Sequence, residues 1–540
     1  MLYINSCEYP YVPGQTLRDY IDAPYAVCAQ VNHAVCPLDL VPKDGETIQL
    51  LDANSRGGFF CYRQTLILMF LTAVRSVFGK TNCIVRHSIS KTTYCEVDLP
   101  PALKIDADRK ILAYMRKLQE QNMPILRHTC TTEEAAELFL QEGDHASADA
   151  MRHLGRDTVN LYQIENGHFH LSGVLAVSTG CIGKFDLKKY KNGFLLGYPN
   201  HESGGKIPPF DSAPQLSKMI EQYSLWEDVL SIRNVSDLNY HIEHADIFDM
   251  ILMQEGLHEK KIAGIADQIK QGTPNVKVVL ITGPSSSGKT TFASKLDIQL
   301  RINSLTPIKI SLDNYYRDVE NALRNEDGSF NFEDLEAIDY QLFNEHLASL
   351  IAGEEVEVPL FSFEKGRRLP EGQKLRLAEG HVLIVEGIHA LNEKLTSAVS
   401  DKNKFKIYTS PITDLSFDNY NPISPTDTRL IRRLVRDFSF RCSSAQNTFD
   451  LWPSVQKGEV KNIFPCEKNA DVVFNSTIIY EFCVFKRYAE AILRDIGRSS
   501  RHYALAQRLL EILSYFHGMD DYKIPSTSLI REFIGGSIFG

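Results

Sequence analysis

A glycine-rich octapeptide is the part of this sequence whose residue types point most directly to chemistry. Residues 283–290 match the pattern GxxxxGK[ST]. In this pattern the glycines let the backbone wrap a phosphate, the lysine reaches the outer phosphates, and the last hydroxyl ligates magnesium. The sequence therefore predicts that ATP binds here together with Mg²⁺. The predicted loop consists of Gly283, Pro284, Ser285, Ser286, Ser287, Gly288, Lys289, Thr290 and Thr291.

The segments on either side of this loop can hold it in place. Residues 276–282 are a short, nearly all-apolar run with β-branched side chains, which is typical of a strand buried on both faces of a parallel sheet. Residues 291–300 are amphipathic and predict a helix. A Gly/Ser turn that matches by chance is the alternative, and the flanking strand and helix favour the phosphate loop.

Two carboxylates follow other predicted strands. Residues 308–312 end at Asp313, and residues 381–385 end at Glu386. Ligands of parallel α/β sheets bind at this carboxyl edge. We predict that Asp313 is the general base for an attacking hydroxyl. We also predict that Glu386, together with Thr290, binds magnesium directly or through water. The alternatives are that Asp313 only caps the next helix and that Glu386 is a plain strand-end carboxylate.

A cluster of arginines follows in a predicted helix. Four of them share one helix face, so their guanidinium groups can converge as a lid over phosphates. We predict that Arg432 and Arg433 bind the nucleotide and that Arg436 and Arg441 act with Lys289 on the transferring group. A solvated, salt-bridged helix face is the alternative. The lid arginines are Arg429, Arg432, Arg433, Arg436 and Arg441.

Bulk properties restrict the class of protein. The 540 residues predict three or four domains, and the net charge of −10 argues against non-specific attraction to nucleic acid or acidic membranes. The 11 cysteines contain no CxxC pair, which indicates reduced thiols in a cytosol. The most apolar run, residues 66–74, is far shorter than the roughly 20 residues of a spanning helix. We therefore expect a cytoplasmic protein without a membrane segment.

Patterning along the chain predicts a multidomain α/β protein. A doubly wound parallel-sheet P-loop kinase domain is expected, preceded by a small β-rich module and an α+β domain. The final stretch, Pro525 to Gly540, is expected to be structured, and docking on the kinase domain or on a neighbouring subunit both stay open. The predicted boundaries are 1–55 for the β-rich module, 56–205 for the α+β domain, 206–270 for a helical connector, 271–490 for the kinase domain and 491–540 for a helical extension.

The predicted kinase domain resembles the uridine kinase and phosphoribulokinase family of P-loop kinases over about residues 276–480. The resemblance implies transfer of the γ-phosphate of ATP, with Mg²⁺, to a nucleoside 5′-hydroxyl, most simply of uridine or cytidine in pyrimidine salvage. It also implies that Asp313 is the base and that Tyr316 and Glu333 lie near the acceptor. The segments that carry it are Gly283 to Thr291, Ser311 to Tyr316, Asn331 to Glu333, Pro359 to Phe363, Val385 to Ile388 and the arginines from Arg429 to Arg441.

The acceptor side departs from the family pattern in two places. Uridine kinases usually show Tyr-Asp-Phe followed by a His and an Arg, whereas this chain runs from Phe361 through Phe363 to Arg368 without that His or Tyr. We expect Phe361, Phe363 and Arg368 to contact the substrate, but the base specificity is left open. The sugar-side acid is Glu333 where Asp is usual.

The first half resembles a different family, the amino-terminal modules of threonyl-tRNA synthetase. Residues 1–52 resemble its TGS-like β-grasp and residues 57–205 its additional domain, on the strength of Val41 to Ile48 and Ser178 to Gly180. The positions of the editing ligands here are Gln64, Leu68, Leu171 and Leu175. Leucine neither binds zinc nor moves a proton, so we predict no metal and no editing hydrolysis there. A regulatory, RNA-contacting or self-assembling role is expected instead.

Three hypotheses about function remain open at this stage. The protein is a nucleoside kinase, a kinase of another hydroxylated metabolite such as a sugar phosphate, or an RNA-binding or regulatory protein that ATP binding switches. The net negative charge and the presence of Asp313 favour an enzyme, because a pure sensor needs no base.

Overall fold

The computed structural model describes residues 1–21, 25–89, 91–200, 203–210, 229–244, 247–318, 320, 324, 331–362, 365–413 and 415–539. The first module is a mixed five-stranded sheet of order β2-β1-β5-β3-β4, in which only β1 and β5 pair in parallel. Its resemblance to a TGS-like β-grasp stays a prediction. The elements are β1 (Leu2–Ile4), β2 (Cys7–Tyr9), η1 (Leu17–Tyr20), β3 (Cys28–Val31), β4 (Ala34–Cys36) and β5 (Thr47–Leu51).

The next part of the chain combines helices with an antiparallel sheet of order β10-β11-β7-β6 and a separate β8-β9 pair. This agrees with the α+β character expected from the sequence. The elements are α1 (Arg56–Phe78), β6 (Cys83–Ile89), β7 (Thr92–Val97), α2 (Ala107–Glu120), β8 (Leu126–Thr131), α3 (Thr132–Glu142), α4 (His145–His153), β9 (Thr158–Gln163), η2 (Thr179–Cys181), β10 (Asp186–Tyr190) and β11 (Gly193–Gly197).

Helix α1 is the central helix of this α+β core. Among helices of the described residues it alone is long and apolar enough to cross a membrane, but 78% of its most apolar window is buried inside the protein, as in a core helix. Leu68, Leu171 and Leu175 lie in the same core. Gln64 donates a hydrogen bond from Nε2 to the Ser172 carbonyl oxygen at 3.2 Å. Of the four positions aligned with editing ligands, the three leucines therefore pack in the core and Gln64 forms a hydrogen bond to the backbone.

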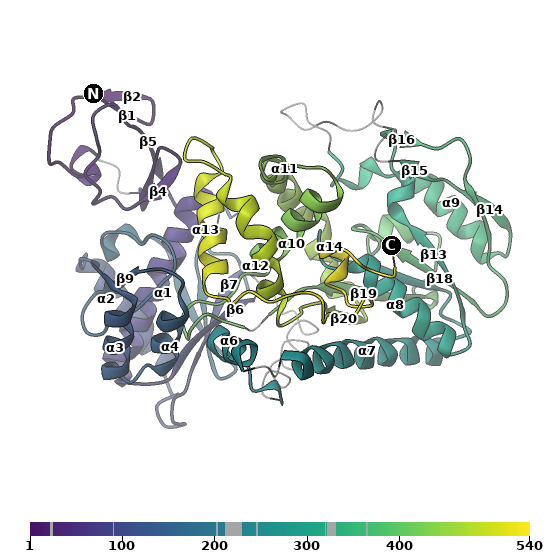
Figure 1. Ribbon diagram of the computed structural model, residues 1–540, viewed down its shortest axis with the longest axis horizontal. Helices are drawn as coiled ribbons and strands as arrows, with labels where there is room; N and C mark the ends of the chain where they lie inside the picture. Colours follow the sequence, from purple (N-terminus) through teal and green to yellow (C-terminus); the bar gives the residue numbers. More distant parts are fainter. Residues whose placement is uncertain are drawn as a thin grey trace.

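Two helices lead into the kinase domain, α6 (Val235–Glu243) and α7 (Ile247–Gly272). They lie in the stretch predicted as a helical connector. Figure 1 shows α7 running along the kinase domain, where it packs against α8 (Lys289–Ile302). One face of α7, including Ile262, Ile265 and Ile269, is buried in the kinase core. Helix α7 is therefore part of the packed body.

The kinase domain is built on a five-stranded sheet of order β13-β18-β12-β19-β20, in which every pair is parallel. Side chains of β12 alternate between two cores: Val279 and Ile281 pack on one face, Val278 and Leu280 on the other. Helix α8 covers the first face and α9 the second. The predicted parallel α/β sheet is confirmed. Its strands are β12 (Val278–Thr282), β13 (Thr306–Ser311), β18 (His381–Glu386), β19 (Lys404–Ser410) and β20 (Val472–Asn475).

Further elements surround this sheet. The helices are α9 (Tyr340–Ile351), α10 (Pro425–Phe440), α11 (Ala445–Gly458), α12 (Glu481–Arg494), α13 (Tyr503–Ser514) and α14 (Arg531–Ile534). The short strands are β14 (Glu355–Val358), β15 (Phe361–Ser362), β16 (Arg367–Arg368) and β17 (Gln373–Arg376). Short 3₁₀ helices are η3 (Leu312–Tyr315), η5 (Leu335–Ala337), η6 (Glu393–Thr396), η7 (Asp401–Asn403) and η9 (Phe464–Asn469), and η8 (Glu459–Ile463) is a short π-helix.

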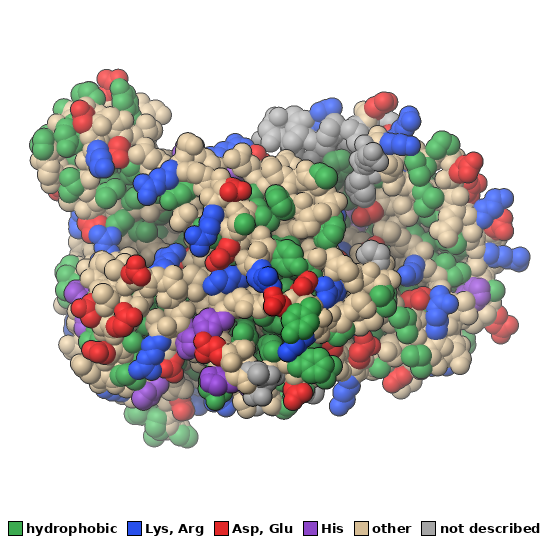
Figure 2. Space-filling model, in the orientation of Figure 1, with side chains coloured by type: hydrophobic (Ala, Val, Ile, Leu, Met, Phe, Trp, Pro, Cys, Tyr) green, Lys and Arg blue, Asp and Glu red, His purple; other side chains and the backbone are tan. Residues whose placement is uncertain are grey.

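Helices α12 and α13 lie between the N-terminal half and the kinase sheet (Figure 1). Tyr515, just after α13, joins both sides: its hydroxyl lies 2.8 Å from His170 Nε2, and its ring stacks on Phe417 of the kinase core with the ring centres 4.3 Å apart. Figure 2 shows acidic and basic side chains interspersed over the face in view. The helical extension expected after residue 490 thus bridges the two halves.

Candidate active site

The phosphate loop joins β12, the central strand of the parallel sheet, to α8. A Cβ on Gly283 would lie 2.0 Å from the Thr409 carbonyl oxygen, so only glycine fits against β19. Gly288 caps α8 with a φ of +81°, which favours glycine. The two glycines of the motif therefore shape the loop and direct the N–H groups of the first turn of α8 toward the position where a phosphate would bind.

The Lys289 side chain turns back onto the loop. Its Nζ donates hydrogen bonds to the carbonyl oxygens of Gly283 at 2.9 Å and Pro284 at 3.1 Å. Loss of contact with water lowers the pKa of Lys289, and the nearby carboxylates Glu386 and Glu532 oppose this change. The lysine is thus held at the loop, where phosphates would exchange for the two carbonyl oxygens.

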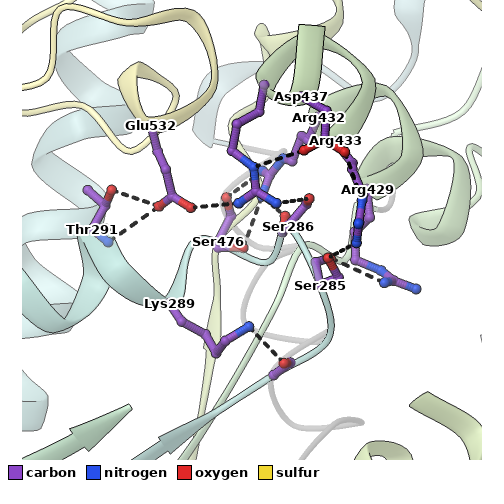
Figure 3. Close-up of polar contacts among 12 residues, drawn as sticks. Ser285, Ser286, Lys289, Thr291, Arg429, Arg432, Arg433, Asp437, Ser476 and Glu532 are labelled. Atoms are coloured by element: carbon purple, nitrogen blue, oxygen red, sulfur yellow. Dashed lines mark hydrogen bonds and ion pairs between the residues drawn. The ribbon is translucent and has the colours of Figure 1, made fainter. Parts of the chain in front are cut away.

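The four lid arginines of α10 converge on the serines of the loop, as their shared helix face predicts. Figure 3 shows three of them, Arg429, Arg432 and Arg433, near Ser285 and Ser286. Each of the four donates one hydrogen bond there. The acceptors are the Ser285 carbonyl oxygen for Arg429 (3.3 Å), the Ser286 carbonyl oxygen for Arg432 (3.3 Å), Ser285 Oγ for Arg433 (3.0 Å) and Ser286 Oγ for Arg436 (3.3 Å). These four residues therefore face the loop rather than solvent, and their role as a lid over phosphates stays a prediction.

Two of these arginines are anchored in buried ion pairs. Arg429 pairs with Glu459 through its two terminal guanidinium nitrogens, and both side chains are at most 3% exposed. Arg432 Nε lies 2.6 Å from Glu481, and both are at most 1% exposed. Such pairs are costly to break, because the remaining charge would be left buried. Arg429 and Arg432 therefore fix α10 against the loop.

The other lid arginines are less firmly held. Arg433 Nε lies 3.0 Å from Asp437, and Arg441 lies 3.4 Å from the same residue with 55% of its side chain exposed. Desolvation lowers the pKa of Arg436 to about 10, and the charge of Arg441 adds to this. Positive charges that are crowded together in this way gain most from a bound polyanion.

Two carboxylates lie at the carboxyl ends of adjacent strands. Glu386 ends β18, pairs in register with Ser311 of β13 and accepts a hydrogen bond from Ser311 Oγ at 2.8 Å. Desolvation raises the pKa of Glu386 to about 7, and the neighbouring Asp313 adds to the rise. Desolvation also raises the pKa of Asp313, whereas Lys289, Arg441 and Arg436 lower it. The geometry thus gathers two partly buried carboxylates beside the phosphate loop.

These groups fit a magnesium ion. Thr290 is exposed at the start of α8 and carries a hydroxyl, and Glu386 supplies carboxylate oxygens, both of the kind that Mg²⁺ prefers. Within the part of the chain that is described, no group of three or more His, Cys, Asp or Glu side chains could hold a metal by itself. This agrees with the usual magnesium site of phosphotransferases, where one or two carboxylates act together with substrate phosphates.

Three of the predicted substrate residues, Tyr316, Glu333 and Phe361, lie near one another. Tyr316 is buried, donates from its hydroxyl to the Phe332 carbonyl oxygen at 3.1 Å and lies 5.8 Å from the Phe361 ring. Desolvation raises the pKa of Glu333 to about 7, and the charge of Arg433 lowers it. Their roles stay predictions. Phe363 lies outside the described residues.

Arg368 is engaged with the protein. Its guanidinium donates to the carbonyl oxygens of Tyr316 at 3.0 Å and Tyr315 at 2.9 Å, and its backbone N–H donates to Asp318 at 2.8 Å. It holds β16 against the turn after β13. Contact with a substrate through this side chain stays a prediction.

Two residues near the loop were missed in the sequence. Glu459 accepts a hydrogen bond from the Ser285 N–H at 3.1 Å, in addition to its pair with Arg429. Glu532 accepts hydrogen bonds from Thr291 and lies 3.6 Å from Arg436. No pattern in the sequence marks either residue, because both come from elements far along the chain.

Comparisons with known proteins place this site in a family. A model described as "Phosphoribulokinase / Uridine kinase family" matches residues 278–479. The uridine kinase of Borreliella burgdorferi is 32% identical over 200 residues, covering 36% of this chain and 85% of that protein. The uridine kinase of Borrelia turicatae is 31% identical over 233 residues, covering 42% of this chain and 98% of that protein.

A solved structure described as a possible uridine kinase from Bacillus stearothermophilus is 18% identical to this chain, with a TM-score of 0.28. The match covers 40% of this chain and 98% of that protein's chain. The two Borreliella and Borrelia relatives are matched over most of their length. The range matched by the family model includes the phosphate loop, both strand-end carboxylates and the lid arginines of α10. Residues 278–479 are a P-loop kinase domain, and through this domain the chain belongs to the phosphoribulokinase/uridine kinase family.

Proposed function

We propose that the protein is an ATP-dependent kinase that transfers the γ-phosphate to the 5′-hydroxyl of a nucleoside, with uridine or cytidine as the acceptor. The observation that carries this proposal is the partly buried Asp313, whose pKa responds to the charges of Lys289 and the lid arginines. A loop that only binds nucleotide needs no carboxylate at this place, whereas phosphoryl transfer to a hydroxyl does. The two relatives named uridine kinase support a nucleoside as the acceptor.

On the donor side, the loop and the first turn of α8 would bind the phosphates through backbone N–H groups. Lys289 Nζ would exchange its two carbonyl partners for phosphate oxygens, and Arg433 and Arg436 would neutralise charge on the transferring group. Mg²⁺ bound through Thr290 and Glu386 would supply further charge neutralisation at the phosphate oxygens. These roles are the ones expected of a kinase of this family.

On the acceptor side, Asp313 accepts the proton of the attacking hydroxyl. The hydroxyl oxygen forms the bond to the γ-phosphorus, while the bond from that phosphorus to the bridging oxygen breaks and ADP leaves. The desolvation that raises the pKa of Asp313 makes it a stronger base. Tyr316, Glu333 and Phe361 would line the acceptor. RNA contact and self-association by the N-terminal half stay predictions.

The test is a coupled ADP-release assay with Mg²⁺ and ATP against a panel of nucleosides and sugar phosphates. We expect turnover with uridine or cytidine, and its loss in Lys289→Ala and in Asp313→Asn. Lys270→Ala, which removes an exposed lysine at the end of α7, serves as the matched control and should keep full activity. Turnover with a sugar phosphate alone would contradict the nucleoside assignment, and ATP binding without any turnover would contradict the kinase.

A further inference from the structure

Residues 525–539, here called the strap, cross the phosphate site after α13. Leu529 and Phe533 are at most 1% exposed and belong to the kinase core. A Cβ on Gly288 would lie 2.7 Å from the Leu529 side chain, so the strap rests directly on the phosphate loop. Ser528 Oγ donates to Glu255 of α7 at 2.6 Å. The strap is therefore a packed part of the domain.

One polar side chain of the strap, Glu532, points into the site (Figure 3). Its Oε2 accepts hydrogen bonds from the Thr291 backbone N–H at 3.3 Å and from Thr291 Oγ1 at 2.8 Å. Its Oε1 lies 3.6 Å from Arg436 NH1. The carboxylate thus accepts two hydrogen bonds at the N-terminus of α8 and at the same time forms an ion pair with one lid arginine.

Nucleotide phosphates need the same donors. Thr291 lies in the first turn of α8, whose backbone N–H groups bind phosphate in loops of this type. One N–H serves one close anion at a time, and a carboxylate and a phosphate at one helix N-terminus repel each other. We propose that Glu532 is an intramolecular occupant of the phosphate site, which the phosphates of the nucleotide must displace. This inference rests on the proposed function, since it requires the loop to bind a nucleotide.

The displacement is confined to the Glu532 side chain. The neighbouring Arg531 donates to the carbonyl oxygens of Asp521 at 2.6 Å and Ile524 at 2.8 Å, which fixes the strap backbone. Phe533 packs under Arg432 and Arg436, with the guanidinium carbons 5.1 Å and 6.0 Å from the ring centre. When Glu532 turns away, Arg436 stays beside the loop and exchanges a carboxylate for a phosphate.

The test compares the affinities of wild type and Glu532→Gln for ATP and for adenosine by calorimetry on the full chain. Glutamine keeps the shape and removes the charge. We expect Glu532→Gln to bind ATP about tenfold more tightly, the scale of one lost competing charge-assisted contact. Adenosine carries no phosphate, so its affinity should not change. Asp520→Asn removes an exposed carboxylate that pairs with Arg487 on the same part of the chain and should leave both affinities unchanged.

A role for Glu532 in positioning Arg436 during catalysis would give a different result. If Glu532 stays in place to position Arg436 during the reaction, Glu532→Gln lowers kcat and leaves ATP affinity equal or weaker, which overturns the proposal. An equal gain for ATP and adenosine indicates general loosening and overturns it as well. Glu532→Asp keeps the charge but draws it back by one methylene, and it should bind ATP with intermediate affinity.

Failure of the proposed function can be distinguished from failure of the inference about Glu532. If Lys289→Ala leaves the ATP affinity of the otherwise unchanged chain intact, nucleotide does not bind at the loop, and the proposed function and this inference both fall. If Lys289→Ala loses ATP but Glu532→Gln gains none, only the inference about Glu532 falls.

Discussion

Replacing Glu386 by glutamine should make the kinase domain more stable at alkaline pH while abolishing its activity. Desolvation and the nearby Asp313 raise the pKa of Glu386 from its ordinary value of 4.5 to about 7. At about 1.4 kcal/mol per pKa unit, ionising this group in the folded protein costs about 3 kcal/mol more than in the unfolded chain. Glu386 keeps some contact with solvent, which screens the cost, so we expect a gain of about 2 kcal/mol in Glu386→Gln.

The sign of the pH dependence follows from proton binding. Between about pH 4.5 and 7 the folded protein holds a proton on Glu386 that the unfolded chain has released. The free energy of unfolding therefore falls as the pH rises through this window, and the full cost is present above it. The advantage of Glu386→Gln should thus be near zero at about pH 4.5 and complete at about pH 8. Activity is lost because the amide no longer carries the charge that attracts magnesium.

Urea unfolding followed by Trp452 fluorescence measures this difference. Trp452 is fully buried in the kinase domain, and a Trp226→Phe background leaves it as the one remaining indole of the two in the chain. Glu371→Gln, at an exposed carboxylate, controls for the loss of one negative charge. A gain that is absent at alkaline pH, or equal at both pH values, would refute the reasoning, because the stability difference must follow the titration of Glu386.

Three further predictions concern the site. Asp313→Asn should lower kcat between about 10² and 10⁴-fold in the ADP-release assay while ATP affinity, measured by calorimetry, stays within about threefold, since the base acts on the acceptor. Arg432→Met should cost about 3–5 kcal/mol in urea unfolding because it leaves the Glu481 charge buried, and adding Glu481→Leu should restore most of this loss. Arg441→Ala should change stability by less than about 0.5 kcal/mol, since its side chain is largely exposed, but should lower kcat in the ADP-release assay, because we predict that this arginine acts on the transferring group.

The central part of the kinase sheet could be predicted because its strands are continuous apolar runs, as in β12 and β18. Strand β19 escaped notice because Lys404 and Lys406 interrupt its apolar pattern. Both lysines are largely buried and pair with Glu393, which Lys406 approaches to 2.8 Å. Ion pairing of this kind allows a buried strand to carry charged residues, and it depends on a turn that the strand sequence does not reveal.

The residues of the site also fall into two groups: those encoded by local sequence spacing and those brought to the loop by contacts distant in the sequence. The phosphate loop and the arginines of α10 are each encoded within one turn or one helix, so spacing alone predicts them. Glu459 and Glu532 reach the loop from 174 and 241 residues away along the chain. Contacts at such separations arise from packing of whole elements, and no periodicity in the sequence records them.

Charge balance explains which arginines can serve the phosphates. A site with several arginines and no nucleotide needs anions of its own, and this chain supplies them in two forms. The carboxylates that pair with Arg429 and Arg432 are at most 1% exposed, so a phosphate could replace them only by leaving a charge buried without its partner. Glu532 keeps 15% of its side chain exposed and pairs with Arg436 at a longer distance. Arg436 is therefore an exchangeable charge of the lid, and the fixed charges of Arg429 and Arg432 keep it within reach of the loop.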